Sequence, residues 1–160
     1  MFIPDKTKSH TPAVSVSHSS AQPIYARPQL ETMFLPVGQM LQIDRVTSIE
    51  GQFARCEIDI AGHWVLPLHF PTDPIFPGTL LIEAAGQAVA VWGWHAGLRG
   101  HPRLVKVEAR FEGPVEPHDQ IVTLTAKVSL RKNICIGSVD VFVAEKKIAE
   151  IKPVIIIVQD

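Results

Sequence analysis

Residues 69–96 read HFPTDPIFPGTLLIEAAGQAVAVWGWHA, and the rest of the chain is organised around this stretch. Its first third is a loop, because three prolines each fix φ and remove a backbone donor, which excludes both a helix interior and a central strand. Gly78 then lets the backbone turn, and an apolar run from Thr79 to Ala96 follows without another proline. At about 1.5 Å per residue, this run predicts one helix of about 18 residues, roughly 27 Å long.

The predicted helix is apolar on almost every side, so we expect it to be buried all round. Glu83 and Gln87 are the exceptions, and their i, i+4 spacing places them on one face, one turn apart. A buried carboxyl is unfavourable unless it is paired or protonated, so apolar surroundings would keep Glu83 in its acid form. One interpretation is a structural glutamate that is satisfied by a backbone group or an arginine. His69, at the head of the rigid loop that leads into the same helix, favours a catalytic pair.

Alternating apolar and polar residues on both sides of the helix predict β-strands. Their connections are short, so we expect an antiparallel sheet, which can curl its apolar face around a single helix. The pattern therefore predicts an α+β domain with a wrapped central helix. The predicted strands are residues 40–49 and 52–60 before the helix, and 105–111, 122–130, 134–144 and 148–158 after it.

The spacing HFPxxPxxPGxxxxE, from His69 to Glu83, resembles the signature of the β-hydroxyacyl-ACP dehydratases (FabZ/FabA-like) of fatty acid synthesis. Residues 35–46 (LPVGQMLQIDRV) resemble the segment that opens the family's fold, and residues 106–128 resemble the strand, turn and strand after its helix. The resemblance extends to about residue 158. It implies the hotdog fold, a long central helix wrapped by a curved antiparallel sheet, with no cofactor.

The resemblance also implies a reaction, in which a (3R)-hydroxyacyl thioester on an acyl carrier protein loses water to give the trans-2-enoyl thioester. His69 is the implied base, because neutral imidazole is available near pH 7, and Glu83 is the implied acid. The N–H groups of Gly78 and Thr79, at the helix N-terminus, are the natural oxyanion site. Gln87 is placed to orient the Glu83 carboxyl. In the family, the His and Glu of one site come from different chains of a homodimer, so a monomer would be inactive.

The sequence departs from the family pattern near the implied site. Leu68 stands where the family often has Gly, and the larger side chain is expected to narrow the site or reorient the loop. Phe76 stands where Met is common. Asp73-Pro74 resembles the branch that also isomerises the double bond, yet that branch carries Asp where this chain has Glu83. We therefore expect simple dehydration.

Two other functions on the same fold stay open. A non-catalytic acyl-binding or scaffold subunit, with Leu68 blocking the chemistry, would bind ligand without turnover. A hotdog thioesterase would release a free thiol instead of forming an enoyl group. The basic residues Arg99, Arg103, Lys106 and Arg110 would dock an acidic carrier protein in a dehydratase, although a solvated strand face explains them equally well.

Composition predicts one domain for the 160 residues. Residues 1–28, rich in Ser, Pro, His and Thr, are predicted to form a disordered or loosely attached arm, and residues 29–160 the hotdog dehydratase-like domain. Cys56 and Cys135 fit no disulfide framework and are expected to sit as small hydrophobes in strands. These thiols and an N-terminus without the apolar region of a signal peptide favour the cytoplasm.

Several other classes of function are disfavoured. The net charge of −1 and the lack of a basic stripe argue against nucleic acid as a partner. Residues 75–96 are long enough to span a membrane, but Pro77, Glu83 and Gln87 argue against a span. No HxxxH or CxxC spacing is present, so no metal site is expected. The same holds for His63, His95, His101 and His118, whose spacing fits no metal motif.

Overall fold

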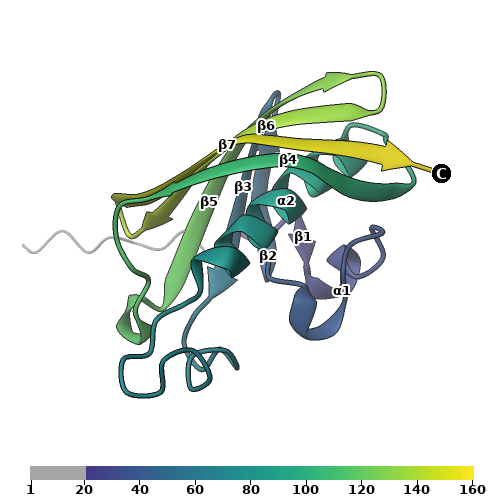
Figure 1. Ribbon diagram of the computed structural model, residues 1–160. Coiled ribbons are helices and arrows are strands. Elements are labelled where there is room, and N and C mark those ends of the chain that lie inside the picture. The colour runs from purple at the N-terminus through teal and green to yellow at the C-terminus, as the bar shows by residue number, and fades with distance from the viewer. Residues whose placement is uncertain (1–20) are drawn as a thin grey trace, which may run out of the picture.

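The computed structural model describes residues 21–160, in which one antiparallel sheet curves around a single long helix (Figure 1). The helix, α2 (Gly78–His95), has 18 residues and follows the proline-rich loop as predicted. Seven strands are hydrogen-bonded in the order β1-β2-β3-β5-β6-β7-β4. This is the α+β hotdog architecture that was predicted. The strands are β1 (Tyr25–Ala26), β2 (Arg45–Glu50), β3 (Phe53–Asp59), β4 (His101–Phe111), β5 (Ile121–Arg131), β6 (Ile134–Val143) and β7 (Lys146–Gln159).

Four of the predicted strands correspond closely to β3, β5, β6 and β7. The first one is shorter than predicted, because residues 38–40 form a 3-10 turn, η1 (Gly38–Met40), and β2 begins only at Arg45. The strand after the helix is longer than predicted and starts at His101. A second 3-10 turn, η2 (Pro117–Asp119), lies in the connection to β5.

The predicted arm over residues 1–28 is wrong for the part that the structure describes. Residues 1–20 lie outside the described residues. Tyr25 pairs with Val46 of β2, and a short helix, α1 (Arg27–Leu30), follows directly. Leu30 is fully buried, so this segment belongs to the core of the domain. The composition misled because this segment is held by contacts with distant residues, namely the pairing of Tyr25 with Val46 and the hydrogen bonds of Arg27 described below.

The prediction that α2 is buried all round is also wrong, because the sheet covers only part of its circumference. Its core face includes Leu81, Ala84, Ala88 and Val91, which are almost fully buried. A close approach to β6 is possible because Gly137 has no side chain; a Cβ there would collide with Val89. The opposite stripe is only half-buried. It consists of Ile82, Glu83, Gly86, Ala90 and Trp94.

Strand β4 lies at the edge of the sheet, next to β7 only. The predicted alternation of inward and outward residues is broken by register shifts between Leu104 and Lys106 and between Val107 and Ala109. As a result, Leu104 and Val105 are 50% and 63% exposed. An edge strand with exposed apolar side chains is a surface that another strand can cover.

The two cysteines are free and buried, Cys56 in β3 and Cys135 in β6, as predicted. Burial raises the pKa of the Cys56 thiol to about 12, with the nearby Glu57 acting in the same direction. Burial likewise raises the pKa of Cys135 to about 11. Within residues 21–160, no helix has the length and apolar character needed to cross a membrane.

Candidate active site

The His69 side chain is held by the loop that joins β3 to α2. Its Nδ1 lies 2.9 Å from the carbonyl oxygen of Ile75. A carbonyl only accepts, so the neutral imidazole carries its proton on Nδ1 and leaves Nε2 as a free acceptor. The backbone N–H of His69 donates to Val65 at 3.0 Å, and the N–H of Phe76 donates to Val115 at 2.8 Å, which fixes both ends of the loop. The ring is half-buried, which suits a base that must meet substrate.

Leu68 does not narrow the site within this protomer. Its side chain is 70% exposed, and its N–H donates to the carbonyl of Val65 at 2.9 Å. Left-handed backbone in this loop falls on Gly62, with a φ of 71°, and on Phe70, with a φ of 54°. The loop therefore forms without the glycine that the family often has before the histidine.

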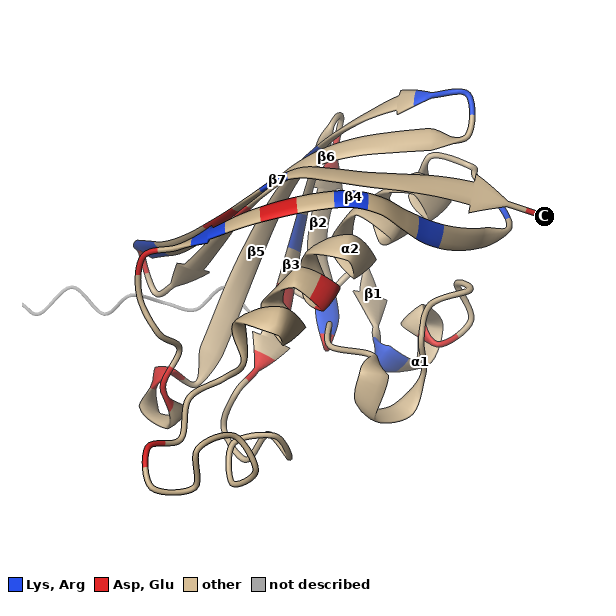
Figure 2. Cartoon of the chain, viewed as in Figure 1, with Lys and Arg blue, Asp and Glu red and all other residues tan. Residues whose placement is uncertain are grey.

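Glu83 is the only Asp, Glu, Lys or Arg in α2 (Figure 2). It belongs to the half-buried stripe of the helix, so the expectation that it is wholly buried is wrong. Its carboxyl instead lines a cavity of about 150 Å³. The other lining residues come from the segment before η1, from α2, from the edge strand β4 and from its neighbour β7: Leu35, Pro36, Ile82, Gly86, Gln87, Ala90, Pro102, Leu104 and Ile156.

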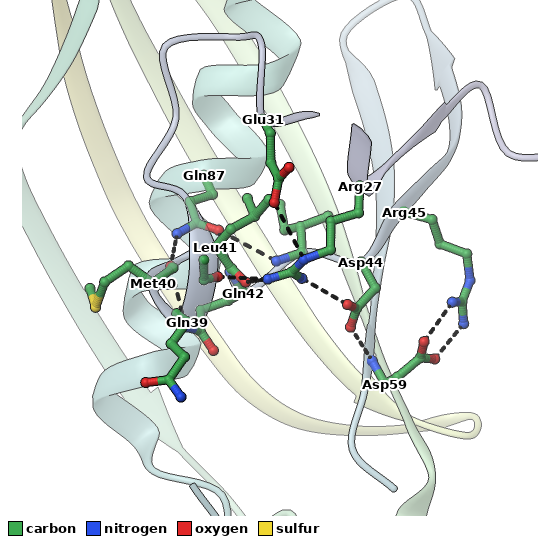
Figure 3. Close-up of polar contacts among 12 residues, drawn as sticks. Arg27, Glu31, Gln39, Met40, Leu41, Gln42, Asp44, Arg45, Asp59 and Gln87 are labelled. Atoms are coloured by element: carbon green, nitrogen blue, oxygen red, sulfur yellow. Dashed lines mark hydrogen bonds and ion pairs between the residues drawn. The ribbon is translucent and has the colours of Figure 1, made fainter. Parts of the chain in front are cut away.

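Gln87 lies one turn beyond Glu83 and is only 2% exposed. Its Nε2 donates to Glu83 Oε1 at 2.9 Å and to the Met40 carbonyl at 2.7 Å. Its Oε1 accepts from the N–H of Gln42 at 2.8 Å and from that of Ile43 at 3.4 Å (Figure 3). Because the amide is held from both sides, it fixes which oxygen of Glu83 is engaged. The second oxygen, Oε2, is left for a proton or a ligand.

The first turn of α2 offers unpaired donors. Pro77 is the N-cap and provides no side-chain bond, and Leu80 N–H is the first to reach the Pro77 carbonyl, at 3.0 Å. Within residues 21–160, the N–H groups of Gly78 and Thr79 have no backbone partner. Donors at a helix N-terminus attract negative charge, so these two groups can stabilise an anion.

Gly78 is also needed for packing. A Cβ on this residue would lie 3.0 Å from the ring of Phe111, at the end of β4. The two residues line a cavity of about 410 Å³ beside the helix N-terminus. Its remaining lining is mostly apolar and comprises Ile75, Phe76, Leu81, Gly113, Pro114 and Val115.

No direct polar contact between His69 and Glu83 is present within residues 21–160. No hydrogen bond or ion pair joins the two described side chains, and His69 is not among the residues that line the Glu83 cavity. By contrast, the predicted link between Gln87 and Glu83 is present as a direct hydrogen bond. Gly78 and Thr79 lie in the first turn of the helix, as the prolines before them indicated.

Sequence reasoning missed the groups that support Gln87. They are backbone atoms of residues 40–43, which carry no signal in the side-chain pattern. It also missed Arg27, which donates to Gly38, Leu41 and Asp44 from a segment that looked disordered. An isolated arginine between two prolines does not indicate this role in the sequence. Residues 21–160 contain no group of three His, Cys, Asp or Glu side chains that could hold a metal ion.

Comparison with known protein families decides the classification. The model of the FabA-like domain matches residues 35–152. The chain belongs to the FabA-like domain family. The matched range contains the His69 loop, α2 and all strands from β2 to β6, so the FabA-like domain includes every predicted site residue.

Solved structures share the fold of this FabA-like chain at low sequence identity. The dehydratase heterocomplex ApeI:P from Xenorhabdus doucetiae matches with a TM-score of 0.66 and 16% identity, over 81% of this chain and 90% of that one. A mutant thioesterase from Pseudomonas aeruginosa matches with a TM-score of 0.63 and 13% identity, over 84% and 95%. A thioesterase from Haemophilus influenzae gives 0.58 and 15%, over 72% and 78%. At such identities the likeness shows the hotdog fold alone.

Proposed function

We propose that this FabA-like protein is a dehydratase, which removes water from a (3R)-hydroxyacyl thioester to give the trans-2-enoyl thioester. The observation that carries the proposal is the environment of the Glu83 carboxyl. A buried amide engages one of its oxygens, and its carboxyl lines a cavity with mainly apolar walls. A carboxylic acid held in this way can deliver a proton from the other oxygen to a leaving hydroxyl.

In the proposed reaction, Nε2 of His69 removes the proton from the α-carbon of the substrate. The electron pair of the C–H bond moves toward the thioester carbonyl, whose oxygen gains negative charge and is stabilised by the N–H groups of Gly78 and Thr79. The pair then forms the α,β double bond as the β-hydroxyl leaves. Glu83 protonates that hydroxyl, so water is released. Proton exchange returns His69 and Glu83 to their starting forms.

We propose that the two catalytic side chains of one site come from two copies of the chain. The arrangement is supported by the absence of His69 from the lining of the cavity that Glu83 borders, and by the lack of a hydrogen bond between the two side chains within residues 21–160. The exposed edge of β4, with Leu104 and Val105, supports a second copy as the partner, because pairing would cover its apolar side chains. Sedimentation should therefore give a homodimer, and Val105→Glu should shift it toward monomers and abolish turnover. A fully active monomer would refute the shared site.

An acyl carrier protein is the proposed donor of the substrate, within a cytoplasmic lipid or polyketide-type pathway. Of the four basic residues after the helix, Lys106 is paired with Glu108 and Arg110 with Glu112. Arg99 lies over the ring of Trp94, at 3.7 Å. Arg103 has no acidic partner within residues 21–160, which makes it the best candidate for contact with an acidic carrier.

The decisive experiment offers the protein a panel of β-hydroxyacyl-carrier and β-hydroxyacyl-CoA thioesters and follows loss of water by mass. His69→Ala and Glu83→Gln should each remove most activity. Glu145→Gln, in an exposed turn, is the matched control and should keep it. Wild-type rates in either site variant would refute the assignment.

A thioesterase is the second candidate, since solved thioesterases share the fold. Release of free thiol without an enoyl product would favour it over dehydration. A non-catalytic acyl-binding subunit is the third: it would bind acyl thioesters and give neither product. The hydrogen bond from His69 Nδ1 to Ile75 argues against this third candidate, because it leaves Nε2 of the ring available as a base.

A further inference from the structure

We propose that Arg27 is a positioning residue for the acid Glu83, acting through the η1 loop (residues 38–42) and Gln87. This inference rests on the proposed dehydratase function and extends it to a residue outside the family match, which begins at residue 35. Hydrogen bonds, joined through one peptide group, connect Arg27 in α1 with Glu83 near the centre of α2.

The first step is the set of hydrogen bonds that Arg27 donates to the η1 loop. Its Nη2 donates to the carbonyl of Gly38 at 2.7 Å and to that of Leu41 at 2.9 Å. Its Nη1 donates to Asp44 Oδ1 at 2.9 Å, and Asp44 Oδ2 in turn accepts the N–H of Asp59 at 2.7 Å. The planar guanidinium thus bridges the start and the end of the loop and ties both to the sheet (Figure 3).

The second step passes through a single peptide group. The carbonyl of Leu41, which accepts from Arg27, shares its peptide bond with the N–H of Gln42, which donates to Gln87 Oε1. The preceding peptide contributes the Met40 carbonyl, which accepts from Gln87 Nε2. A cation on the carbonyl side polarises the peptide and strengthens its N–H as a donor. The loop that Arg27 holds therefore sets the orientation of the Gln87 amide.

The third step ends at the carboxyl. Gln87 Nε2 has two hydrogens; one is given to Met40 and the other to Glu83 Oε1. If the loop shifts, the amide loses its backbone partners and is free to rotate, and the Glu83 carboxyl rotates with it. Proton delivery depends on the direction of Oε2, so the rate of the chemical step should respond to Arg27 without any contact between Arg27 and substrate.

Arg45 provides a matched control, because it is an arginine of the same cluster that does not touch the loop. Its guanidinium binds Glu57 and Asp59, each at 2.7 Å, on the outer side of the sheet. Arg45→Gln removes the same charge and breaks comparable ion pairs. If Arg27 only stabilised the fold, Arg27→Gln and Arg45→Gln should change kcat to a similar extent.

The test uses the full chain with a β-hydroxyacyl-carrier thioester, and measures kcat and KM separately after circular dichroism has confirmed folding. Arg27→Gln should lower kcat by roughly 10-fold or more with KM little changed, whereas Arg45→Gln should retain kcat. Arg27→Lys keeps the positive charge but loses the planar set of donors that the guanidinium provides, and should give an intermediate kcat. In a Gln87→Leu background, Arg27→Gln should have almost no further effect, because the link is already cut.

A second measurement does not depend on turnover. Hydrogen exchange of the Gln87 side-chain amide, followed by NMR, should be roughly 10-fold faster or more in Arg27→Gln and unchanged in Arg45→Gln. Unchanged exchange, a kcat equal to wild type in Arg27→Gln, or equal losses of kcat with and without Gln87 would each overturn the inference. A wild-type protein with no dehydration would instead overturn the proposed function, and the exchange rates would still decide whether Arg27 positions Gln87.

Discussion

Gln87 donates a hydrogen bond of 2.9 Å from Nε2 to Oε1 of Glu83, one helical turn earlier. The donor amide is almost completely buried, whereas the acceptor borders an open cavity. A rigid donor behind a more accessible acid leaves only one carboxyl oxygen for chemistry. In the proposed reaction, this pair would direct the proton that Glu83 delivers, and the predictions that follow test the arrangement and its surroundings.

Replacing Gln87 by Leu should damage both stability and catalysis. The change removes the Gln87 acceptor from the buried N–H groups of Gln42 and Ile43 and leaves the Met40 carbonyl with only the 3.2 Å bond from Gln42 Nε2, so we expect a loss of about 3 kcal/mol in the free energy of unfolding. The kcat should fall more than KM changes, because Glu83 loses its support. Urea unfolding and steady-state kinetics measure the two effects. The same substitution at the exposed Gln52 is the control and should change stability by less than about 0.5 kcal/mol.

Replacing Gly78 by Ala should bring the new Cβ against the Phe111 ring, at 3.0 Å in the present packing. We expect a loss of about 1 kcal/mol in the free energy of unfolding, and slower turnover because the oxyanion donors shift. In a Phe111→Ala background the clash is absent, so the same change should have a much smaller effect on stability. Equal losses in both backgrounds would show that the ring contact is not the cause.

Gly86→Ala is expected to separate stability from function. A Cβ there meets no atom within 4 Å, and Ala favours the helix by about 0.5–1 kcal/mol, so thermal unfolding should occur at a higher temperature. The added methyl projects into the cavity that Glu83 lines, and Gly86→Leu would fill it further. Turnover of longer acyl chains should fall first. Gly93→Ala is the control, because its Cβ would lie 3.0 Å from Cys135 Sγ and should give no gain in stability.

The two thiols should be inert in the native protein. Burial raises the pKa of Cys56 to about 12 and that of Cys135 to about 11, so almost no thiolate exists near neutral pH. A thiol reagent should label neither cysteine before unfolding and both in guanidinium chloride, as mass spectrometry can count. Rapid labelling of native protein would contradict the packing of these strands.

His63 should make the fold sensitive to mild acid. Burial lowers the pKa of His63 below its ordinary value of 6.5, with Arg27 acting in the same direction and Asp44 opposing them. Below 6.5 the unfolded chain binds a proton that the folded chain resists, so the free energy of unfolding decreases as pH falls toward the lowered pKa. His63→Phe should flatten this part of the stability curve. Urea midpoints for both proteins, measured in the same buffers, test the effect; parallel curves would exclude His63 as its source.

The sequence was sufficient for the helix, for most strands and for the family. Three prolines and an apolar run without a further proline define α2, and the alternation of apolar and polar residues defines β5. It failed where a contact between distant segments decides the outcome. Residues 21–28 looked like an arm because no local pattern shows that Tyr25 pairs with Val46.

The candidate site was predictable to a similar degree. The i, i+4 spacing of Glu83 and Gln87 led to the hydrogen bond between them. The same helix was expected to hide Glu83, since an apolar sequence does not reveal which side the sheet leaves uncovered. That depends on the curvature of the sheet and on the register shifts in β4, which are properties of strand pairing rather than of residue type.

The position of Leu30 and Met33 has a practical consequence for anyone who shortens the chain. Both side chains are almost completely enclosed, yet both precede residue 35, where the match to the family begins. A chain that begins at residue 35 would lack these two core side chains, and it would also lack the hydrogen bonds that Arg27 makes. The truncated product should be prone to precipitate, although every motif residue would still be present.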